Sequence, residues 1–196
     1  EIERIKNKNI TLLAGHPLIA YTISAAQQSG IFKSIIVSSD SDEVYRIAIK
    51  TGCNWRRRED EHAGGDSPDV EWVHDLAAHG DLSEIDCFAI LRPTSPFRTA
   101  ATIRRAYKQF IHDEVHSLRA VEIARQHPGK MWFCNGPGYP MTPVCDAKRS
   151  DGVPWHSSPT QTLPLVYVQN ASLEMAWTYV VDSFGTISGR KIAPFR

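Results

Sequence analysis

Two arginines and two hydroxyl residues, Arg92, Thr94, Ser95 and Arg98, follow directly on a short apolar run at residues 87–91. Guanidinium and hydroxyl groups are the side chains with which proteins bind phosphates and carboxylates. If the apolar run is a strand, these groups stand at its carboxyl end, which is where open α/β sheets bind ligands. The stretch therefore predicts an anion site, although an ordinary capped surface loop would have a similar composition.

The elements around this stretch should hold it in place. Residues 87–91 have the apolar character of a buried strand, and Pro93 and Pro96 restrict the turn that follows. Apolar residues then recur at helical spacing over 100–111, and Thr99 stands where it can cap that helix. We expect a strand, a rigid turn and an amphipathic helix.

The same alternation of apolar runs and helical patterns continues along the 196 residues, which is typical of one domain. It predicts an α/β fold with a mostly parallel, doubly wound sheet and helices on both faces. The expected helices cover 18–28, 43–51, 70–78 and 100–111, and the expected strands cover 35–40, 87–91, 117–123, 165–174 and 192–195.

Composition excludes several classes of function. Lys and Arg together number 22, as do Asp and Glu, so net charge gives no reason to expect nucleic acid or a membrane surface as a partner. No apolar run is long enough to span a bilayer. Four cysteines are scattered without a CxxC pair, which fits buried thiols in a reducing cytoplasm better than disulfides or a zinc site.

The stretch Leu91–Thr99 (Leu-Arg-Pro-Thr-Ser-Pro-Phe-Arg-Thr) also resembles a family signature, (Q/R)PTSPxR, of the acylneuraminate cytidylyltransferases. These enzymes activate sialic acid and related nine-carbon sugars. The resemblance implies a Rossmann-like nucleotidyltransferase that joins CTP to an α-keto acid sugar, forming a CMP-sugar and pyrophosphate. Such a transfer depends mainly on positioning and charge neutralisation.

At the start of the chain, Lys8 and Asn9 resemble the Lys-Asn pair that closes the family's phosphate loop. Taken alone, they are typical of a solvated tail. The resemblance implies that both contact the nucleotide and that Lys8 neutralises charge on the phosphates as the catalytic lysine. The family's first strand and most of its loop are expected before Lys8 and appear missing from the sequence.

The polar segment 54–69 is typical of a surface loop that leads into the helix 70–78. It resembles the family segment RPxELAxDxS with one extra residue. In that register Arg58 contacts the nucleotide, Asp66 and Ser67 end the motif, and the pair caps the helix. Arg57 remains an alternative to Arg58.

Two further motifs are expected on the sugar side. His-Pro-Gly-Lys at 127–130 resembles a family motif whose lysine faces the acidic sugar, which implies that Lys130 pairs with the sugar carboxylate. Without the resemblance, an exposed turn lysine is the simpler interpretation. Asn170 begins an Asn-Ala-Ser sequence similar to the family's Asn-Gly-Ala beside the sugar. Together with Arg92, Thr94 and Ser95, these residues form the expected sugar site.

One substitution bears on the choice of sugar. Arg92 stands where the common sialic acid enzymes have Gln, and a guanidinium offers only donors. In the family, the arm usually carries an arginine just before a Leu-Pro step. In this sequence that position is Thr160 or Gln161. One basic residue is thus gained around the expected acid pocket and another is lost. This difference favours an acid other than N-acetylneuraminate, such as a legionaminic-type sugar. Another nucleoside triphosphate such as GTP, acting on a sugar-1-phosphate, is the alternative.

The segment 133–162 is rich in Gly, Pro and Ser and has little periodicity. The family uses this region, about 131–166 here, as an arm that enters a second subunit, so the resemblance implies a homodimer.

The resemblance also implies Mg²⁺, bound by an Asp-x-Asp pair expected after Phe195 and absent from this sequence. Asp40 is the nearest alternative ligand, but it is expected to cap the helix 41–50. A dimeric binding module without catalytic activity is the non-enzymatic alternative.

Overall fold

The computed structural model describes residues 7–59, 61, 67–80, 82 and 84–196. The chain divides into two compact units. The first consists of Glu1–Ala120 with Asn170–Arg196, and the second is Val121–Gln169. The arm expected at 131–166 lies inside the second unit.

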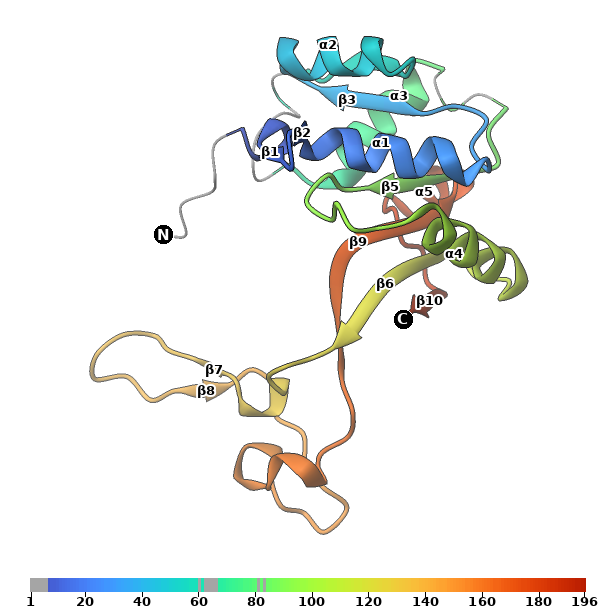
Figure 1. Cartoon of the computed structure of the whole chain (residues 1–196). Coiled ribbons are helices and arrows are strands. Elements are labelled where there is room, and N and C mark those ends of the chain that lie inside the picture. Colours follow the sequence, from blue (N-terminus) through green and yellow to red (C-terminus); the bar gives the residue numbers. More distant parts are fainter. Residues whose placement is uncertain (1–6, 60, 62–66, 81, 83) are drawn as a thin grey trace. The chain divides into compact units, whose positions relative to one another are not determined.

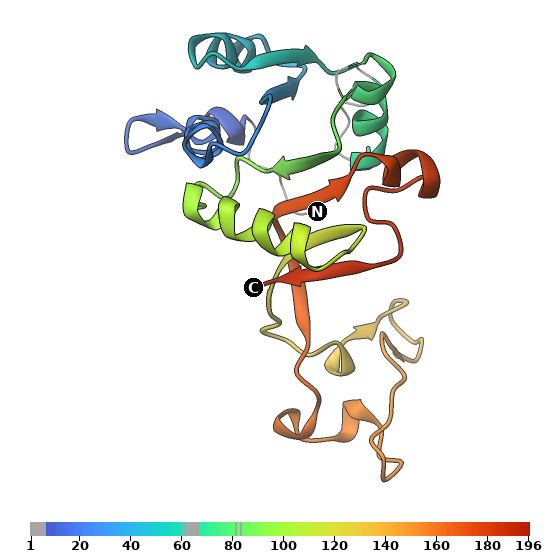
Figure 2. The same ribbon diagram turned by 90° about the vertical axis from the view of Figure 1, so that its right-hand side faces the viewer.

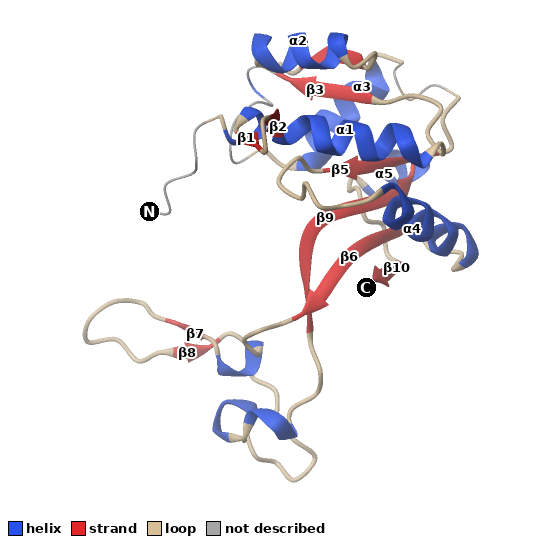
Figure 3. Cartoon of the chain, in the orientation of Figure 1, coloured by secondary structure: helices blue, strands red, loops and turns tan. Residues whose placement is uncertain are grey.

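Helices and strands alternate along the first unit, as the sequence predicts (Figures 1 and 3). Its helices are η1 (Lys8–Ile10), α1 (Leu18–Ser29), α2 (Asp42–Lys50), α3 (Asp69–Ala78), α4 (Ala100–His112) and α5 (Tyr179–Phe184). Its strands are β1 (Leu12–Leu13), β2 (His16–Pro17), β3 (Ile36–Ser39), β4 (Asn54–Arg57), β5 (Cys87–Leu91) and β10 (Ile192–Phe195). Two longer strands, β6 (Ser117–Ile123) and β9 (Tyr167–Trp177), continue into the second unit.

The sheet of the first unit comes in two main parts. β3 pairs with β4 in parallel, and a second part has the order β10-β6-β9-β5. In that part β10 is parallel to β6, whereas β9 is antiparallel to β5. The strands lie between α1 and α4 on one side and α3 and α5 on the other (Figure 2). The α/β fold with helices on both faces is therefore confirmed, with a mixed sheet.

The main core forms where α4 packs on the longer sheet. Ile103, Ala106 and Phe110 recur at i, i+3 and i+7, so they share one face of the helix, and all three are fully buried. They meet Leu118 from β6 and Leu173 from β9 in one apolar cluster. Burying each large side chain contributes about 1.5–3 kcal/mol, so this cluster fixes the helix that follows the 92–99 turn.

The expectation of a surface loop over 54–69 was wrong at its start, because Asn54–Arg57 forms β4. Trp55 packs against Tyr45 with ring centroids 4.9 Å apart, and it contacts the cluster around Val37. Neighbouring Asn54 and Arg57 are exposed. One large aromatic residue anchors the strand, and the charged residues around it conceal the pattern in the sequence.

The predicted capping residue is confirmed for one helix and differs from the structure for two. Thr99 caps α4, since its side chain accepts a hydrogen bond from the Thr102 amide. Asp40 does not cap α2; Ser41 does, by accepting from the Val44 amide at 3.4 Å. α3 begins after Pro68 without a side-chain cap, and Ser67 instead donates to the Glu71 carboxylate.

This assignment at α2 is testable. Ser41→Ala should lower the free energy of unfolding by about 1 kcal/mol, because it removes the acceptor for an amide at the helix start. Asp40→Ala is the matched control and should change it by less than about 0.5 kcal/mol. Urea unfolding followed by circular dichroism measures both. A larger loss in the Asp40 variant would return the capping role to Asp40.

The second unit contains short elements. They are η3 (Pro128–Lys130), β7 (Trp132–Phe133), β8 (Thr142–Pro143), η4 (Trp155–Ser157) and η5 (Thr160–Thr162). β7 and β8 form an antiparallel hairpin. His127 contacts Trp155 at 5.3 Å between ring centroids and bonds to the Pro164 carbonyl through Nε2. These contacts give the Pro- and Gly-rich segment a defined structure.

Within the part of the chain that the structure describes, no helix combines the length and the apolar character that crossing a membrane requires.

Candidate functional site

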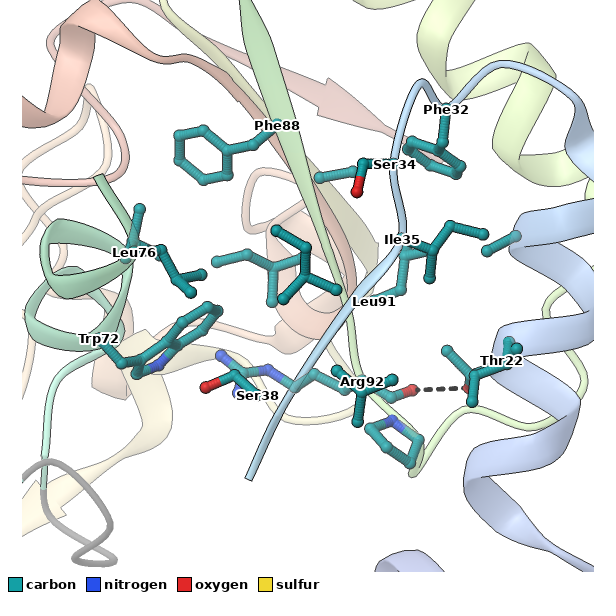
Figure 4. A pocket seen from close by; sticks show the side chains of 18 of the residues that line it. Thr22, Phe32, Ser34, Ile35, Ser38, Trp72, Leu76, Phe88, Leu91 and Arg92 are labelled. Carbon is teal, nitrogen blue, oxygen red and sulfur yellow. Dashed lines mark hydrogen bonds between the residues drawn. The ribbon is translucent and has the colours of Figure 1, made fainter. Parts of the chain in front are cut away.

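A cavity of about 530 Å³ opens in the first unit between β3 and β5 (Figure 4). α1 contributes Thr22 to one wall, and α3 contributes Trp72 and Leu76 to the opposite wall. Five residues predicted to bind nucleotide or sugar line this cavity: Lys8, Asn9, Arg58, Arg92 and Thr94. They come from three separate segments of the chain, and the fold brings them to one cavity.

Arg58 follows β4 and turns into the cavity wall. Its Nε donates to Ser38 Oγ at 3.3 Å and its Nη2 to the Ser38 carbonyl at 3.2 Å. Its guanidinium lies over the Trp72 ring, 5.0 Å from the centroid. Burial lowers the pKa of Arg58, and the Asp40 and Asp69 carboxylates oppose that effect. These contacts orient a partly desolvated cation, which strengthens its attraction for an anion.

Arg57, the alternative to Arg58, has a different environment. Its Nη1 lies 3.4 Å from Asp42 Oδ1 at the start of α2, and more than half of its side chain is exposed. It does not line the cavity. Exposed pairs of this kind contribute little free energy. The geometry therefore favours Arg58 for the predicted nucleotide contact.

Arg92 is held by acidic groups at the end of β5. Its Nη2 forms an ion pair with Asp69 at the start of α3 and lies 3.6 Å from Glu174 Oε1. Glu174 is buried and pairs through its other oxygen with Arg119 Nη1 at 2.6 Å. An anion that binds Arg92 must therefore share this guanidinium with Asp69. The carboxylates of Asp69 and Glu174 repel an anionic ligand. Such a ligand can bind at Arg92 only if further cations, such as Arg58, also contact it.

Arg98 does not line the cavity, which corrects the expectation from the sequence. Only 8% of the residue is exposed, and its Nη1 and Nη2 groups donate to Arg92 O, Ser172 O and Thr22 Oγ1. Burial lowers the pKa of Arg98 to about 10, which still leaves it charged at neutral pH. Arg98 thus binds the turn to α1 and β9 and acts as an internal brace.

Four other predicted residues lie elsewhere. Ser95 and Ser67 belong to the first unit but do not line the cavity. Asn170 also lies outside the cavity wall, and its Oδ1 accepts from the Ser172 amide at 3.1 Å. Lys130 lies in the second unit, where Nζ donates to the His156 and Ser158 carbonyls. Asp66 falls outside the described residues.

Sequence reasoning missed two residues that shape the site, Asp69 and Trp72. Trp72 Nε1 donates to Asp69 Oδ1 at 3.1 Å, so the first turn of α3 holds both the carboxylate and the ring in place. Together they position Arg92 and Arg58. Their i, i+3 spacing at the helix start is visible in the sequence, but it does not reveal which arginines they contact.

Three cations, Lys8, Arg58 and Arg92, line the cavity, and such groups can bind and orient anions. No group of three or more His, Cys, Asp or Glu side chains that could hold a metal ion exists among the residues described.

Comparison with known proteins identifies the family. A cytidylyltransferase family model matches residues 3–127. The chain is 37% identical over 131 residues to a CMP-N,N'-diacetyllegionaminic acid synthase of Legionella pneumophila, covering 64% of this chain and 53% of that protein. It is 38% identical over 107 residues to an N-acylneuraminate cytidylyltransferase of Escherichia coli, covering 54% and 25%. The chain thus spans about half of the first relative and a quarter of the second.

Solved structures agree on the fold. A CMP:2-keto-3-deoxy-manno-octonic acid synthetase complexed with CTP superposes with a TM-score of 0.65 at 12% identity, covering 98% of this chain and 84% of that one. A 4-diphosphocytidyl-2C-methyl-D-erythritol synthase of Anaerococcus prevotii gives 0.55 at 10% identity, covering 96% and 84%. The matched family model covers more than half of the sequence, and the chain therefore belongs to the cytidylyltransferase family.

Proposed function

We propose that this chain carries the substrate-binding part of an enzyme that transfers CMP from CTP to a nine-carbon α-keto acid sugar of the sialic or legionaminic type. The observation that carries the proposal is that Lys8, Arg58 and Arg92, which come from separate segments, all line one cavity. The relatives named for legionaminic and acylneuraminic acids support the sugar class.

In this reaction a sugar hydroxyl oxygen bonds to the α-phosphorus of CTP, and the bond from that phosphorus to the bridging oxygen of pyrophosphate breaks. The hydroxyl proton passes to solvent, and pyrophosphate leaves. Lys8 and Arg58 would neutralise charge on the phosphates, with Asn9 beside them, and Arg92 and Thr94 would orient the acid. The cations act by holding charged groups in place in a partly desolvated site.

Three residues with predicted roles, Ser67, Ser95 and Asn170, do not line the cavity. Ser95 and Asn170 would contact the sugar, and Ser67 with Asp66 would contact the nucleotide, by resemblance to the family motif. Mg²⁺ belongs to the proposal only as the usual counterion of CTP, supplied with the nucleotide. These roles are supported by motif similarity alone.

Pyrophosphate release tests the proposal. CTP or GTP is supplied with Mg²⁺ and with N-acetylneuraminate, a legionaminic-type acid or a hexosamine-1-phosphate. Release with CTP and a keto acid is the expected result, and the preferred acid identifies the group that Arg92 recognises. Release only with GTP and a sugar phosphate would replace the proposed substrates. No release with any pair would leave a binding module.

Lys130 gives a test on the sugar side. Lys130→Ala should raise the KM for the sugar several-fold more than the KM for CTP if the ammonium pairs with the sugar carboxylate. Because Nζ also donates to two carbonyls, amide exchange over 154–160 serves as the structural control. Faster exchange with an unchanged sugar KM would assign Lys130 to holding the second unit together. An effect on CTP alone would move it to the nucleotide side.

The proposal includes a homodimer formed through residues 131–166. In support, the second unit exposes large apolar side chains, which are typical of interfaces; they are Trp132, Phe133, Tyr139, Met141 and Leu165. Sedimentation equilibrium measures the mass directly. The proposed location is the cytoplasm, where thiols stay reduced. The expectation of buried thiols holds only for Cys53, because Cys134 is exposed and the other two cysteines are partly exposed.

A further inference from the structure

The two arginines of the cavity have different electrostatic environments. Arg92 Nη2 forms an ion pair with Asp69 Oδ2 and lies 3.6 Å from Glu174 Oε1. Arg58, by contrast, donates to the Ser38 hydroxyl and carbonyl and forms no ion pair with a carboxylate among the described residues. The protein itself therefore neutralises one arginine of the cavity and leaves the other available for an anion.

The neutralisation of Arg92 extends behind it into the sheet. Glu174 lies on β9, and its second oxygen is 2.6 Å from Arg119 Nη1 on β6. Arg92 and Arg119 contribute two positive charges to this network, and Asp69 and Glu174 contribute two negative charges. The four groups together carry no net charge, so they offer little attraction to a further anion.

The Asp69 carboxylate is fixed on both of its oxygens. Oδ1 accepts a hydrogen bond from Trp72 Nε1 at 3.1 Å, while Oδ2 pairs with Arg92. Asp69 is also the first residue of α3, where the helix dipole favours a negative charge. A mobile surface carboxylate would turn away and leave Arg92 to an incoming anion, whereas Asp69 is held beside it.

Arg92 still has donors to offer. The residue lines the cavity, and 35% of its side chain is exposed. Both acidic contacts use Nη2, and within the part of the chain that the structure describes neither Nη1 nor Nε has a hydrogen-bond partner. N–H donors next to fixed carboxylates suit an acceptor without a charge of its own, such as a hydroxyl or amide carbonyl oxygen.

We propose that Asp69 is a specificity-determining residue: it neutralises Arg92, so that the site rejects a phosphate group there and the arginine donates to an uncharged oxygen of the substrate. The inference rests on the proposed function, because an acid of the sialic or legionaminic type carries hydroxyl and N-acyl oxygens but no phosphate. A site can select its ligand by repelling competitors as well as by attracting the ligand. Here the repelled competitor is a sugar phosphate, and the carboxylate of the acid is left to a different cation.

Phosphate binding tests this inference without requiring turnover. Inorganic phosphate is titrated into the chain at neutral pH and low ionic strength, and isothermal titration calorimetry measures the Kd. Asp69→Asn should tighten binding by roughly fivefold or more, because it removes the charge that neutralises Arg92. The amide oxygen of asparagine still offers Trp72 an acceptor, so the first turn of α3 is retained. Adding Arg92→Gln to Asp69→Asn should abolish the gain, which assigns it to Arg92.

Asp42→Asn is the matched control for the titration. Asp42 is the first residue of α2, as Asp69 is of α3, and it pairs with Arg57, which does not line the cavity. The same charge is thus lost from the same helix position, and the Kd for phosphate should change by less than about twofold. An equal gain in the Asp42 variant, no gain in the Asp69 variant, or a gain that survives Arg92→Gln would overturn the inference.

A kinetic comparison supplies a second test that does not replace Asp69. Arg92→Gln keeps an N–H donor without the charge, whereas Arg92→Ala keeps neither. If the arginine donates to an uncharged oxygen, Arg92→Gln should raise the KM for the sugar acid by less than about threefold and Arg92→Ala by roughly tenfold or more. Equal increases would mean that Arg92 binds a charged group, against the inference. Because the phosphate titration needs no turnover, failure of this inference and failure of the proposed function are distinguished.

Discussion

Arg58→Ala is expected to weaken CTP binding by roughly tenfold or more. The structure holds the Arg58 guanidinium in the cavity wall through two hydrogen bonds to Ser38 and the Trp72 ring. Charge-assisted hydrogen bonds contribute about 1.5–3 kcal/mol, which corresponds to a tenfold to hundredfold change in Kd. Isothermal titration calorimetry with CTP measures the loss, and the apo variant's unfolding curve checks that the site still forms.

Arg57→Ala is the matched control, because it removes the same charge from the neighbouring position. Arg57 pairs with Asp42 on the surface and does not line the cavity, so the Kd for CTP should change less than about twofold. Arg58→Lys separates charge from shape, since lysine keeps the cation but lacks the planar fork that lies over Trp72. An unchanged Kd for Arg58→Ala, or a larger change for Arg57→Ala, would contradict the assignment.

Much of the fold follows from local pattern. The strand at 87–91 and the helix after Thr99 agree with the sequence prediction within a residue, since apolar periodicity and a cap act over short distances. Strand β4 was missed because its stabilising contacts are not local. Trp55 gains its partners, Tyr45 and the Val37 cluster, only when β3 and α2 are in place.

The candidate site likewise combines features that local sequence predicts with features that depend on distant contacts. The sequence, with its family resemblance, predicts ligand contacts for Arg58 and Arg92, and both residues line the cavity. It could not predict that Arg98 turns inward while Arg92, six residues earlier, does not. That difference depends on Thr22 and Ser172, which lie far away in the sequence and offer acceptors only in the folded chain. The orientation of a side chain depends on tertiary contacts, whereas the residue type can be read directly from the sequence.

The inward orientation of Arg98 leads to the second large prediction. Arg98→Met should lower the free energy of unfolding by about 3 kcal/mol, measured by urea denaturation at neutral pH. Some buried charges can be replaced by apolar residues without loss, when both partners of an ion pair are replaced together. Arg98 differs, because two of its partners are the backbone carbonyls of Arg92 and Ser172, which remain partly buried acceptors in any variant.

Lys108→Met on the following helix, α4, controls for the loss of a positive charge, since Lys108 is exposed and its replacement should change stability by less than about 0.5 kcal/mol. The slope of the unfolding curve should stay constant in both variants, because the surface exposed on unfolding is nearly unchanged. An Arg98 variant as stable as the Lys108 variant would show that the turn does not need its brace. A destabilised variant that still binds CTP normally would show that Arg92 keeps its position through Asp69 and Glu174 alone. If binding weakens along with stability, the rigidity of the 92–98 turn is itself part of the anion site, as its two prolines already indicate.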